Sequence, residues 1–249
     1  RSLVGSEMCI RDSIKLADIS NIEQQYFSNT YFQFTNDIDM EYDTRFDGIC
    51  SDPKNVDSKF SGKIDGAGYS LKRMLLDRVL WKTRPEDDTT GQGGSPDNMN
   101  SRLCGGFVGR LAVDGEIRNL TIAADCKLQF WSQSGPIAAY NWGLIDNCRN
   151  YATVTSYSNI VGGIVGRNEL NGKVTNCYNA GDVFGGYDTA GGITGYNYGF
   201  IENCANTGTV EIKSISKFMT NTKFLNTAGG ITGNINGGAT VSYTHLTLP

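Results

Sequence analysis

The sequence predicts an all-β fold, a single-stranded parallel β-helix (a solenoid) with coils of about 28 residues. Two lines of sequence recur along the chain, and within each line apolar and polar residues alternate. The copies of the first line start 27 to 38 residues apart, a repeat length typical of solenoids. These copies begin at Gly105, Gly135, Gly162, Gly191 and Gly229.

The first line reads as a β-strand because its residue types alternate with a period of two. Ile164 matches an apolar residue in every copy, Gly166 matches glycine or alanine, and Arg167 matches a large polar or aromatic residue. We therefore expect Ile164 to point into the core and Arg167 to point outward. The residues at the Arg167 position form a predicted outward lane. This lane consists of Arg110, Tyr140, Arg167 and Tyr196.

The second line, such as "GKVTNC" from Gly172, places an asparagine and then a cysteine after an inward apolar residue. Asparagine tolerates left-handed backbone angles, so we expect it at a bend. Removing it at Asn176 should then cost about 1–3 kcal/mol by unpairing buried backbone groups. Leu120 replaces the cysteine in one copy, which indicates that this position faces the core. The expected ladders are Asn119, Asn147, Asn176 and Asn203, and Cys148, Cys177 and Cys204.

A third short strand is expected to end near Val154, Val183 and Val210, which gives three strands in each coil. Stacked coils place like residues on like residues at the spacing of β-strands, ~4.8 Å. One coil cannot bury its own inner face, and this explains why the sequence repeats.

The two ends of the chain do not share the sequence pattern of the rest. Residues 1–13 and 241–249 resemble translated sequencing-adapter read-through, so we expect them to pack poorly and exclude them from the fold. Residues 14–240 are expected to form the β-helix, as a fragment of a longer protein, with clear repeats over 105–240.

Three segments are expected to depart from the regular coil. Leu16, Ile19 and Ile22 have helical spacing, which suggests a short N-terminal helix that caps the first coil. Two excursions, 76–103 and one within 211–228, interrupt the period. Insertions in solenoids become loops on one face, often the binding face.

Composition excludes several classes of partner. The net charge is −4 and no basic patch stands out, which argues against nucleic acid. No run of 18 apolar residues occurs, so no membrane insertion is expected. The single histidine, His245, lies in the excluded tail, so the HExxH motif of a zinc peptidase cannot occur in the β-helix. We expect no cofactor and no metal.

The glycine line, joined to the pattern of "IENCANTGTV" from Ile201, resembles the GLUG repeat family of bacterial surface proteins. The segments "YFQFTNDIDM" at 31–40 and "FSGKIDGAGYSLKRM" at 60–74 are similar to the leader that often precedes such repeats. The resemblance implies a secreted protein, extracellular or at the cell surface, in a family with some members attached to immunoglobulin-cleaving metallopeptidases. It transfers no catalytic residue to this chain.

The cysteines and the acidic residues each leave alternatives open. No CxxC pair occurs, and in-register parallel neighbours are poor disulfide partners, so the ladder cysteines are expected to be buried thiols. A disulfide among Cys50, Cys104 and Cys126 stays open. Acidic clusters around Asp39 and Asp87 could hold calcium, although solvated loops are the simpler interpretation.

Two functions fit this scaffold. The outward lane combines rings and guanidinium groups, which can hold a glycan or a host or cell-surface protein. Parallel β-helices also carry polysaccharide lyases and glycoside hydrolases, and the outward acids Asp146 and Glu202, two coils or ~9.6 Å apart, could form an inverting pair. We favour a non-catalytic, adhesin-like binding or spacer module, because no nucleophile–base pair is visible.

Overall fold

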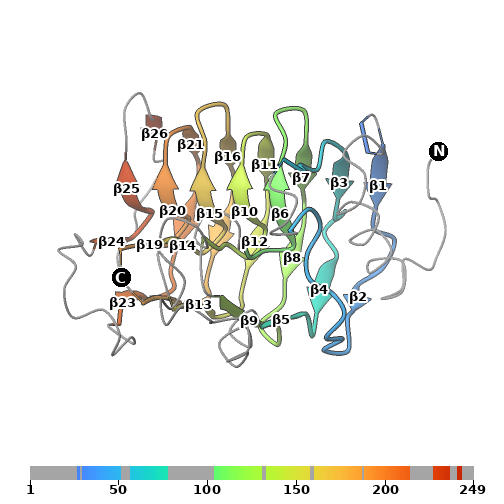
Figure 1. The fold of residues 1–249 in the computed structure, drawn as a ribbon, viewed down its shortest axis with the longest axis horizontal. Coiled ribbons are helices and arrows are strands. Elements are labelled where there is room, and N and C mark those ends of the chain that lie inside the picture. Colours follow the sequence, from blue (N-terminus) through green and yellow to red (C-terminus); the bar gives the residue numbers. More distant parts are fainter. Residues whose placement is uncertain are drawn as a thin grey trace, which may run out of the picture.

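The computed structural model describes residues 27–28, 30–51, 57–77, 104–130, 133–157, 160–186, 188–213, 227–235 and 240–242. Over these residues the chain winds into stacked coils of short strands (Figure 1). Like strands of successive coils pair in parallel, as in β10 with β15 (Ala138–Asn141 and Val165–Asn168). The parallel β-helix is therefore confirmed, and no helix occurs among the described residues.

Five parallel sheets run along the solenoid, and we name them A to E. Sheet A contains β1 (Tyr31–Gln33), β3 (Lys63–Asp65), β7 (Glu116–Arg118), β11 (Leu144–Asp146), β16 (Lys173–Thr175), β21 (Phe200–Glu202) and β26 (Thr240–Ser242). Sheet B contains β2 (Ile38–Asp39), β4 (Ser70–Lys72), β8 (Thr121–Ile122), β12 (Arg149–Asn150), β17 (Tyr178–Asn179) and β22 (Ala205–Asn206).

Three further sheets complete the coil. Sheet C contains β6 (Val108–Leu111), β10, β15, β20 (Thr194–Asn197) and β25 (Thr232–Ile235). Sheet D contains β5 (Leu75–Asp77), β9 (Lys127–Phe130), β13 (Val154–Ser156), β18 (Val183–Gly185) and β23 (Val210–Ile212). Sheet E contains β14 (Ile160–Gly162), β19 (Thr189–Gly191) and β24 (Thr227–Gly229).

A regular coil passes through sheets A, B, D, E and C in that order, so it holds five strands. The prediction of three strands was wrong, because asparagine and glycine bends divide the coil more finely than the alternation alone reveals. Val154, Val183 and Val210 begin strands of sheet D instead of ending them.

The register confirms the coil length. Ile117, Ile145, Val174 and Ile201 are partners in successive strands of sheet A, at intervals of 28, 29 and 27 residues. All four side chains are fully buried, so each strand contributes one apolar residue to a continuous internal column. Burial of this column supplies the apolar contacts that a single coil lacks.

The leader segment belongs to the same solenoid. Phe32 in β1 is the register partner of Ile64 in β3, which in turn pairs with Ile117 of the first clear repeat. This end of the core is aromatic, with the rings of Phe27, Phe32 and Phe60 at centroid distances of 5.5 to 6.1 Å. The expected single β-helix therefore extends through both leader segments.

Several predicted segments lie partly or wholly outside the described residues. These include residues 1–13, the capping helix over 16–22, and most of both excursions. The last described strands before the two excursions, β5 and β23, both belong to sheet D. At the C-terminal side, Val241 and Ser242 pair with Ile201 and Glu202, so sheet A continues past the boundary predicted at 241.

Candidate functional site

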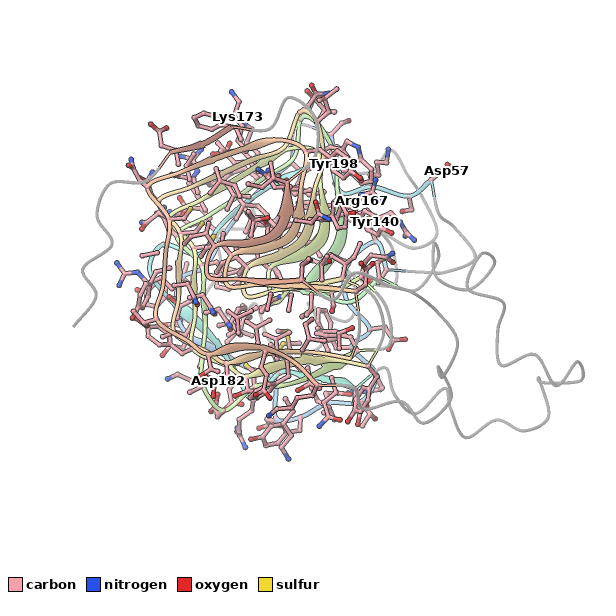
Figure 2. All side chains as sticks on the ribbon, turned by 90° about the vertical axis from the view of Figure 1, so that its left-hand side faces the viewer. Asp57, Tyr140, Arg167, Lys173, Asp182 and Tyr198 are labelled. Carbon is pink, nitrogen blue, oxygen red and sulfur yellow. The ribbon has the colours of Figure 1, made fainter. Side chains whose placement is uncertain are left out.

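The predicted outward lane lies along one face of sheet C. Arg110, Tyr140, Arg167 and Tyr196 are register partners in β6, β10, β15 and β20. Figure 2 shows Tyr140 and Arg167 next to each other on the same side of the solenoid. The register continues to Asn234, whose side-chain amide donates to the Tyr196 hydroxyl at 3.0 Å. The stacked lane is thus confirmed, while its role in binding stays a prediction.

A second row of side chains follows the lane, two residues further along the chain and directly after each strand ends. The residue in between is a buried asparagine, such as Asn141, so its two neighbours emerge on the same face. Tyr140 stacks on Trp142 with ring centroids 5.6 Å apart, and Tyr196 stacks on Tyr198 at 5.5 Å. The sequence prediction omitted this row, which the "YNWG" and "YNYG" motifs signal. The second row consists of Trp142, Glu169 and Tyr198.

A cation contacts each aromatic pair. Lys59 Nζ lies 4.2 Å from the centroid of the Trp142 ring, and Arg167 Cζ lies 4.8 Å from that of Tyr198. Arg167 Nε also lies 2.7 Å from Glu169 Oε1, an ion pair by distance, although its N–H is not aligned for a hydrogen bond. Each cation thus contributes a cation–π contact to the face.

Partial burial shapes the ionisation of this face. Desolvation raises the pKa of Glu169, and the nearby Arg167 charge opposes that rise. Desolvation also raises the pKa of the Tyr140 hydroxyl to about 12. The side chain of Glu169 is only 15% exposed, so its carboxylate depends on Arg167 in place of water.

Arg110 does not contribute to the accessible part of the face. It is 3% exposed, and its Nη1 donates to the carbonyl oxygen of Cys50 at 3.2 Å. Among the described residues of the preceding coil, Ile49 and Phe60 pair with β6 through isolated bridges, and Cys50 follows Ile49. The expectation that Arg110 points into solvent was therefore wrong, because the side chain is buried and bonds to the backbone of Cys50.

The arrangement limits how a ligand can use the rings. Each aromatic pair is nearly parallel, with interplanar angles of 12° for Tyr140–Trp142 and 16° for Tyr196–Tyr198, so part of the ring surface is already in contact. Cations occupy a further part of Trp142 and Tyr198. The face thus presents ring edges, hydroxyls and paired charges rather than isolated flat rings.

The predicted cysteine ladder is confirmed inside the solenoid. Cys148, Cys177 and Cys204 are buried, and the backbone N–H groups of Cys148 and Cys177 each donate to the next sulfur at 3.4 Å. Burial raises the pKa of the Cys177 thiol, which favours the neutral form. No disulfide links any of the described cysteines, Cys50, Cys104 and Cys126 included.

The predicted asparagine ladder also forms, but on the surface. Asn119, Asn147, Asn176 and Asn203 all have left-handed backbone angles, with φ between 48° and 55°. Asn147 Nδ2 donates to Asn119 Oδ1 at 2.8 Å, and Asn176 Nδ2 donates to Asp146 Oδ1 at 2.7 Å. Because Asn176 is exposed, the expectation that it pairs buried groups was wrong, and its role is to hold the bend.

Two buried asparagine ladders were not predicted. In the first, Asn141 Nδ2 donates to Asn168 Oδ1, and Asn168 Nδ2 donates to Asn197 Oδ1, both at 2.8 Å. In the second, the same bonds link Asn150 to Asn179 at 2.8 Å and Asn179 to Asn206 at 2.7 Å. All but Asn206 are fully buried. The Asn-x-Gly spacing in "NAG" and "NTG" is the signal for the second ladder.

These ladders explain the glycine pairs. A Cβ placed on Gly163 would lie 2.5 Å from the side chain of Asn179, and one on Gly192 would lie 2.3 Å from that of Asn206. The bend between sheets E and C therefore packs directly on the amide ladder, and only glycine fits.

The proposed inverting pair lies on sheet A, on strands where Asp146 pairs with Thr175 and Thr175 with Glu202. Asp146 Oδ1 accepts hydrogen bonds from Thr175 Oγ1 at 2.6 Å and from Asn176 Nδ2 at 2.7 Å. These bonds tie Asp146 to neighbouring coils, which is the role of a structural carboxylate.

The N-terminal acidic cluster is neutralised by neighbouring cations. Asp37 contacts Lys72 at 2.6 Å, Asp39 contacts Arg73, and Asp43 contacts Arg45. No group of three or more potential metal ligands occurs among the described residues, and Asp87 lies outside them. Within the same residues, no helix is long and apolar enough to cross a membrane.

Comparison with known proteins agrees with this architecture. The model of the GLUG motif matches residues 157–183. These residues make up one coil, from the end of β13 to the start of β18, and include the glycine line at Gly162 and the second line at Gly172. The resemblance to GLUG repeats is confirmed over those residues. No curated protein matches the chain.

One solved structure shares the fold. The chain is similar to a putative immunoglobulin A1 protease from Bacteroides ovatus, with a TM-score of 0.55 and 21% sequence identity. The match covers 94% of this chain and 61% of that chain. This chain is thus a parallel β-solenoid that carries a GLUG motif, and it spans less than two thirds of its structural neighbour.

Proposed function

We propose that the chain is a non-catalytic binding module of a secreted or cell-surface bacterial protein, with an adhesin-like role. The outer face of sheet C would contact the ligand, and the rest of the solenoid would act as a rigid spacer. One observation carries the proposal: the side chains of this face change from coil to coil, whereas the asparagine and cysteine ladders keep one residue type over three successive coils. Coil geometry requires the ladders, but it does not require tyrosine, tryptophan, arginine and glutamate on the outside.

The chemistry of the face suits recognition. Tyrosine and tryptophan combine a large apolar surface with a polar edge, and they are frequent in binding sites. Arg167 and Glu169 add a donor and an acceptor, both held in place by their neighbours. Such a preorganised surface loses little side-chain entropy when a ligand binds.

The alternative is a polysaccharide lyase or glycoside hydrolase. Its candidate acids, Asp146 and Glu202, lie on sheet A, and Asp146 is committed to two structural hydrogen bonds. The structural neighbour is named for a protease, but an identity of 21% supports the shared fold alone. We therefore propose a binding role for this part of the parent protein, extracellular or at the cell surface.

Binding to arrays of glycans and of cell-surface proteins tests the proposal. The double change Tyr140→Ala with Tyr196→Ala should weaken binding by about tenfold or more, since it removes both lane tyrosines. A matched control is Tyr151→Ala with Tyr178→Ala, a pair near sheet B whose rings contact each other at 6.1 Å. Circular dichroism and urea unfolding would verify folding of both variants.

Two results would refute the proposal. One is a ligand whose affinity is indifferent to Tyr140 and Tyr196 but sensitive to the control pair. The other is turnover of a polysaccharide that disappears with Asp146→Asn or Glu202→Gln.

A further inference from the structure

The turns that join sheet C to sheet A alternate in length. The connection from β6 to β7 has four residues (112–115), and that from β15 to β16 also has four (169–172). The connections from β10 to β11 and from β20 to β21 have only two (142–143 and 198–199). Figure 1 shows the consequence as taller loops above β6–β7 and β15–β16, separated by a lower one.

The side chains follow the same two-coil period. The tall turns carry the exposed apolar residues Val113 and Leu170, which are 58% and 71% exposed. The low turns carry the aromatic residues of the second row, Trp142 and Tyr198. A two-coil unit of 56 residues, measured from Tyr140 to Tyr196, is therefore superimposed on the regular coil.

Two similar groups of side chains result, which differ in the coil that supplies the cation: Lys59 comes from two coils before Tyr140, and Arg167 from the coil next to Tyr196. The first contains Tyr140 stacked on Trp142, with Lys59 over the Trp142 ring. The second has the same order, with Tyr196 stacked on Tyr198 and Arg167 over the Tyr198 ring. In Figure 2, Tyr140, Arg167 and Tyr198 lie on one side of the solenoid. We call these two groups subsite 1 and subsite 2.

The subsites are two strand spacings apart, which is ~9.6 Å along the solenoid axis. A ligand that fills both must therefore be elongated, must lie along the axis and must repeat at this distance. A linear polysaccharide meets these conditions when two sugar residues form its repeat. Binding at one subsite raises the effective concentration at the other, so affinity should grow with chain length.

The charges on the face indicate an uncharged polymer. Arg167 is paired with Glu169, and the positive charge of Lys59 also acts on the Glu169 carboxyl, whose pKa it lowers. An anionic polymer would meet the Glu169 carboxylate beside these cations. Sugar hydroxyls can instead donate to Glu169 and accept from Arg167 and Lys59 without a net charge.

An extended peptide fits less well. Addition of a peptide strand requires an open sheet edge, whereas the subsites lie on a sheet face whose strands β10, β15 and β20 are paired on both sides. A polyproline II helix repeats every ~9.3 Å, close to the subsite spacing. However, a proline ring offers no hydroxyl to the charged donor and acceptor of this face.

We infer that subsites 1 and 2 bind one linear, uncharged polysaccharide chain along the solenoid axis, with one two-residue repeat at each subsite. This inference rests on the proposed binding function of the sheet C face and deepens it. Leu170 and Val113 would border the chain at the tall turns.

Calorimetric titration with cellohexaose and chitohexaose, and with the matching disaccharides, tests the inference. One of the two hexaoses should bind about tenfold or more tighter than its disaccharide, because it spans both subsites. Tyr198→Ala and Trp142→Ala should each remove that gain while weakening the disaccharide only about twofold, since one subsite remains. Raising salt from about 0.05 M to about 0.5 M should change the affinity less than about twofold.

Two further variants separate binding from folding. Tyr151→Ala, on the sheet B side, should leave the hexaose affinity unchanged. Lys59→Gln removes the cation over Trp142 but leaves the stacking of Tyr140 on Trp142 in place, and it should still weaken the hexaose. A loss of binding with Trp142→Ala could then not be attributed to misfolding alone.

Several outcomes would overturn the inference. These are a disaccharide that binds as tightly as the hexaose, tighter and salt-sensitive binding of a polygalacturonate hexamer, or binding of a proline-rich peptide in place of both hexaoses. If a protein ligand depends on Tyr140 and Tyr196 while no glycan binds, the inference fails and the proposed binding function stands. If neither binds, both fail.

Discussion

Two sets of residues in the same coils follow different periods. The ladder amides Asn150, Asn179 and Asn206 occupy three successive coils, and each bonds to the next. The outer face of sheet C repeats only in every second coil, as in Tyr140 and Tyr196. The first pattern serves stacking, because each buried amide donates a hydrogen bond to the amide of the next coil. The second has no such role, and this difference separates residues that build the solenoid from residues that can serve a ligand.

The largest expected effect falls on the strict ladder. Asn179 Nδ2 donates to Asn206 Oδ1 and to the Gly181 carbonyl oxygen, both at 2.7 Å, and Asn179 Oδ1 accepts from Asn150. Asn179→Ala leaves these buried groups unpaired and should lower the free energy of unfolding by about 2–5 kcal/mol. Urea denaturation measures the loss, and a change under about 0.5 kcal/mol would show that the ladder does not hold the coils together.

A smaller loss is expected at the exposed ladder. Asn176 has a φ of 55° and lies on the surface, so its substitution removes the tolerance for left-handed backbone but unpairs little that is buried. Asn176→Ala should cost about 1 kcal/mol, and Asn176→Gly should cost less, because glycine adopts this conformation readily. If both variants lose the same free energy of unfolding, the hydrogen bonds of the Asn176 side chain, and not its backbone angle, account for the loss.

One substitution should stabilise the protein. Thr194 is fully buried, its hydroxyl has no hydrogen-bond partner, and its register partner in the preceding coil is Val165. Thr194→Val keeps the shape and removes the unsatisfied hydroxyl, so the free energy of unfolding should rise by about 1 kcal/mol. Thermal unfolding would reveal it as a higher Tm, and a lower Tm would argue that the hydroxyl is satisfied in solution.

The smallest effect concerns pH and belongs to the sheet C face. The amide ladders do not titrate, whereas desolvation raises the pKa of Glu169 above its ordinary value of 4.5. Because the pKa of Glu169 is raised in the folded state, protonation of this carboxyl favours folding. Its contribution to the free energy of unfolding is complete below pH 4.5 and is lost as the pH rises through the folded-state pKa. Glu169→Gln should flatten the dependence of stability on pH in that window, and an unchanged slope would place the titration elsewhere.

The sequence predicts those parts of the fold in which apolar residues or glycines recur at the same position of each coil. The column through Ile145 and Val174, the cysteine ladder and the lane through Tyr140 and Arg167 are found at the predicted register. Burial was harder to predict. Asn176 and Asn179 are three residues apart in one motif, yet one is exposed and the other buried. Only the path of the coil decides this, because the left-handed bend at Asn176 turns its side chain outward.

The candidate site shows a similar limit. The alternation of Arg167 and Tyr196 is visible in the sequence, but Trp142 and Tyr198 join the face only because a buried asparagine precedes each of them. The burial of Arg110 depends on Cys50, 60 residues earlier in the chain, which no local pattern connects to it.

The most direct test of this separation is to measure stability and binding in the same two variants, Asn179→Ala and Tyr198→Ala. Urea unfolding gives the stability, and calorimetric titration with whichever of cellohexaose and chitohexaose binds the parent chain gives the affinity. We expect Asn179→Ala to lose about 2–5 kcal/mol of stability while the folded protein keeps its affinity within about twofold. We expect Tyr198→Ala to lose about tenfold in affinity with a smaller loss of stability. The account is contradicted if Asn179→Ala weakens binding as much as Tyr198→Ala does, or if Tyr198→Ala changes stability alone.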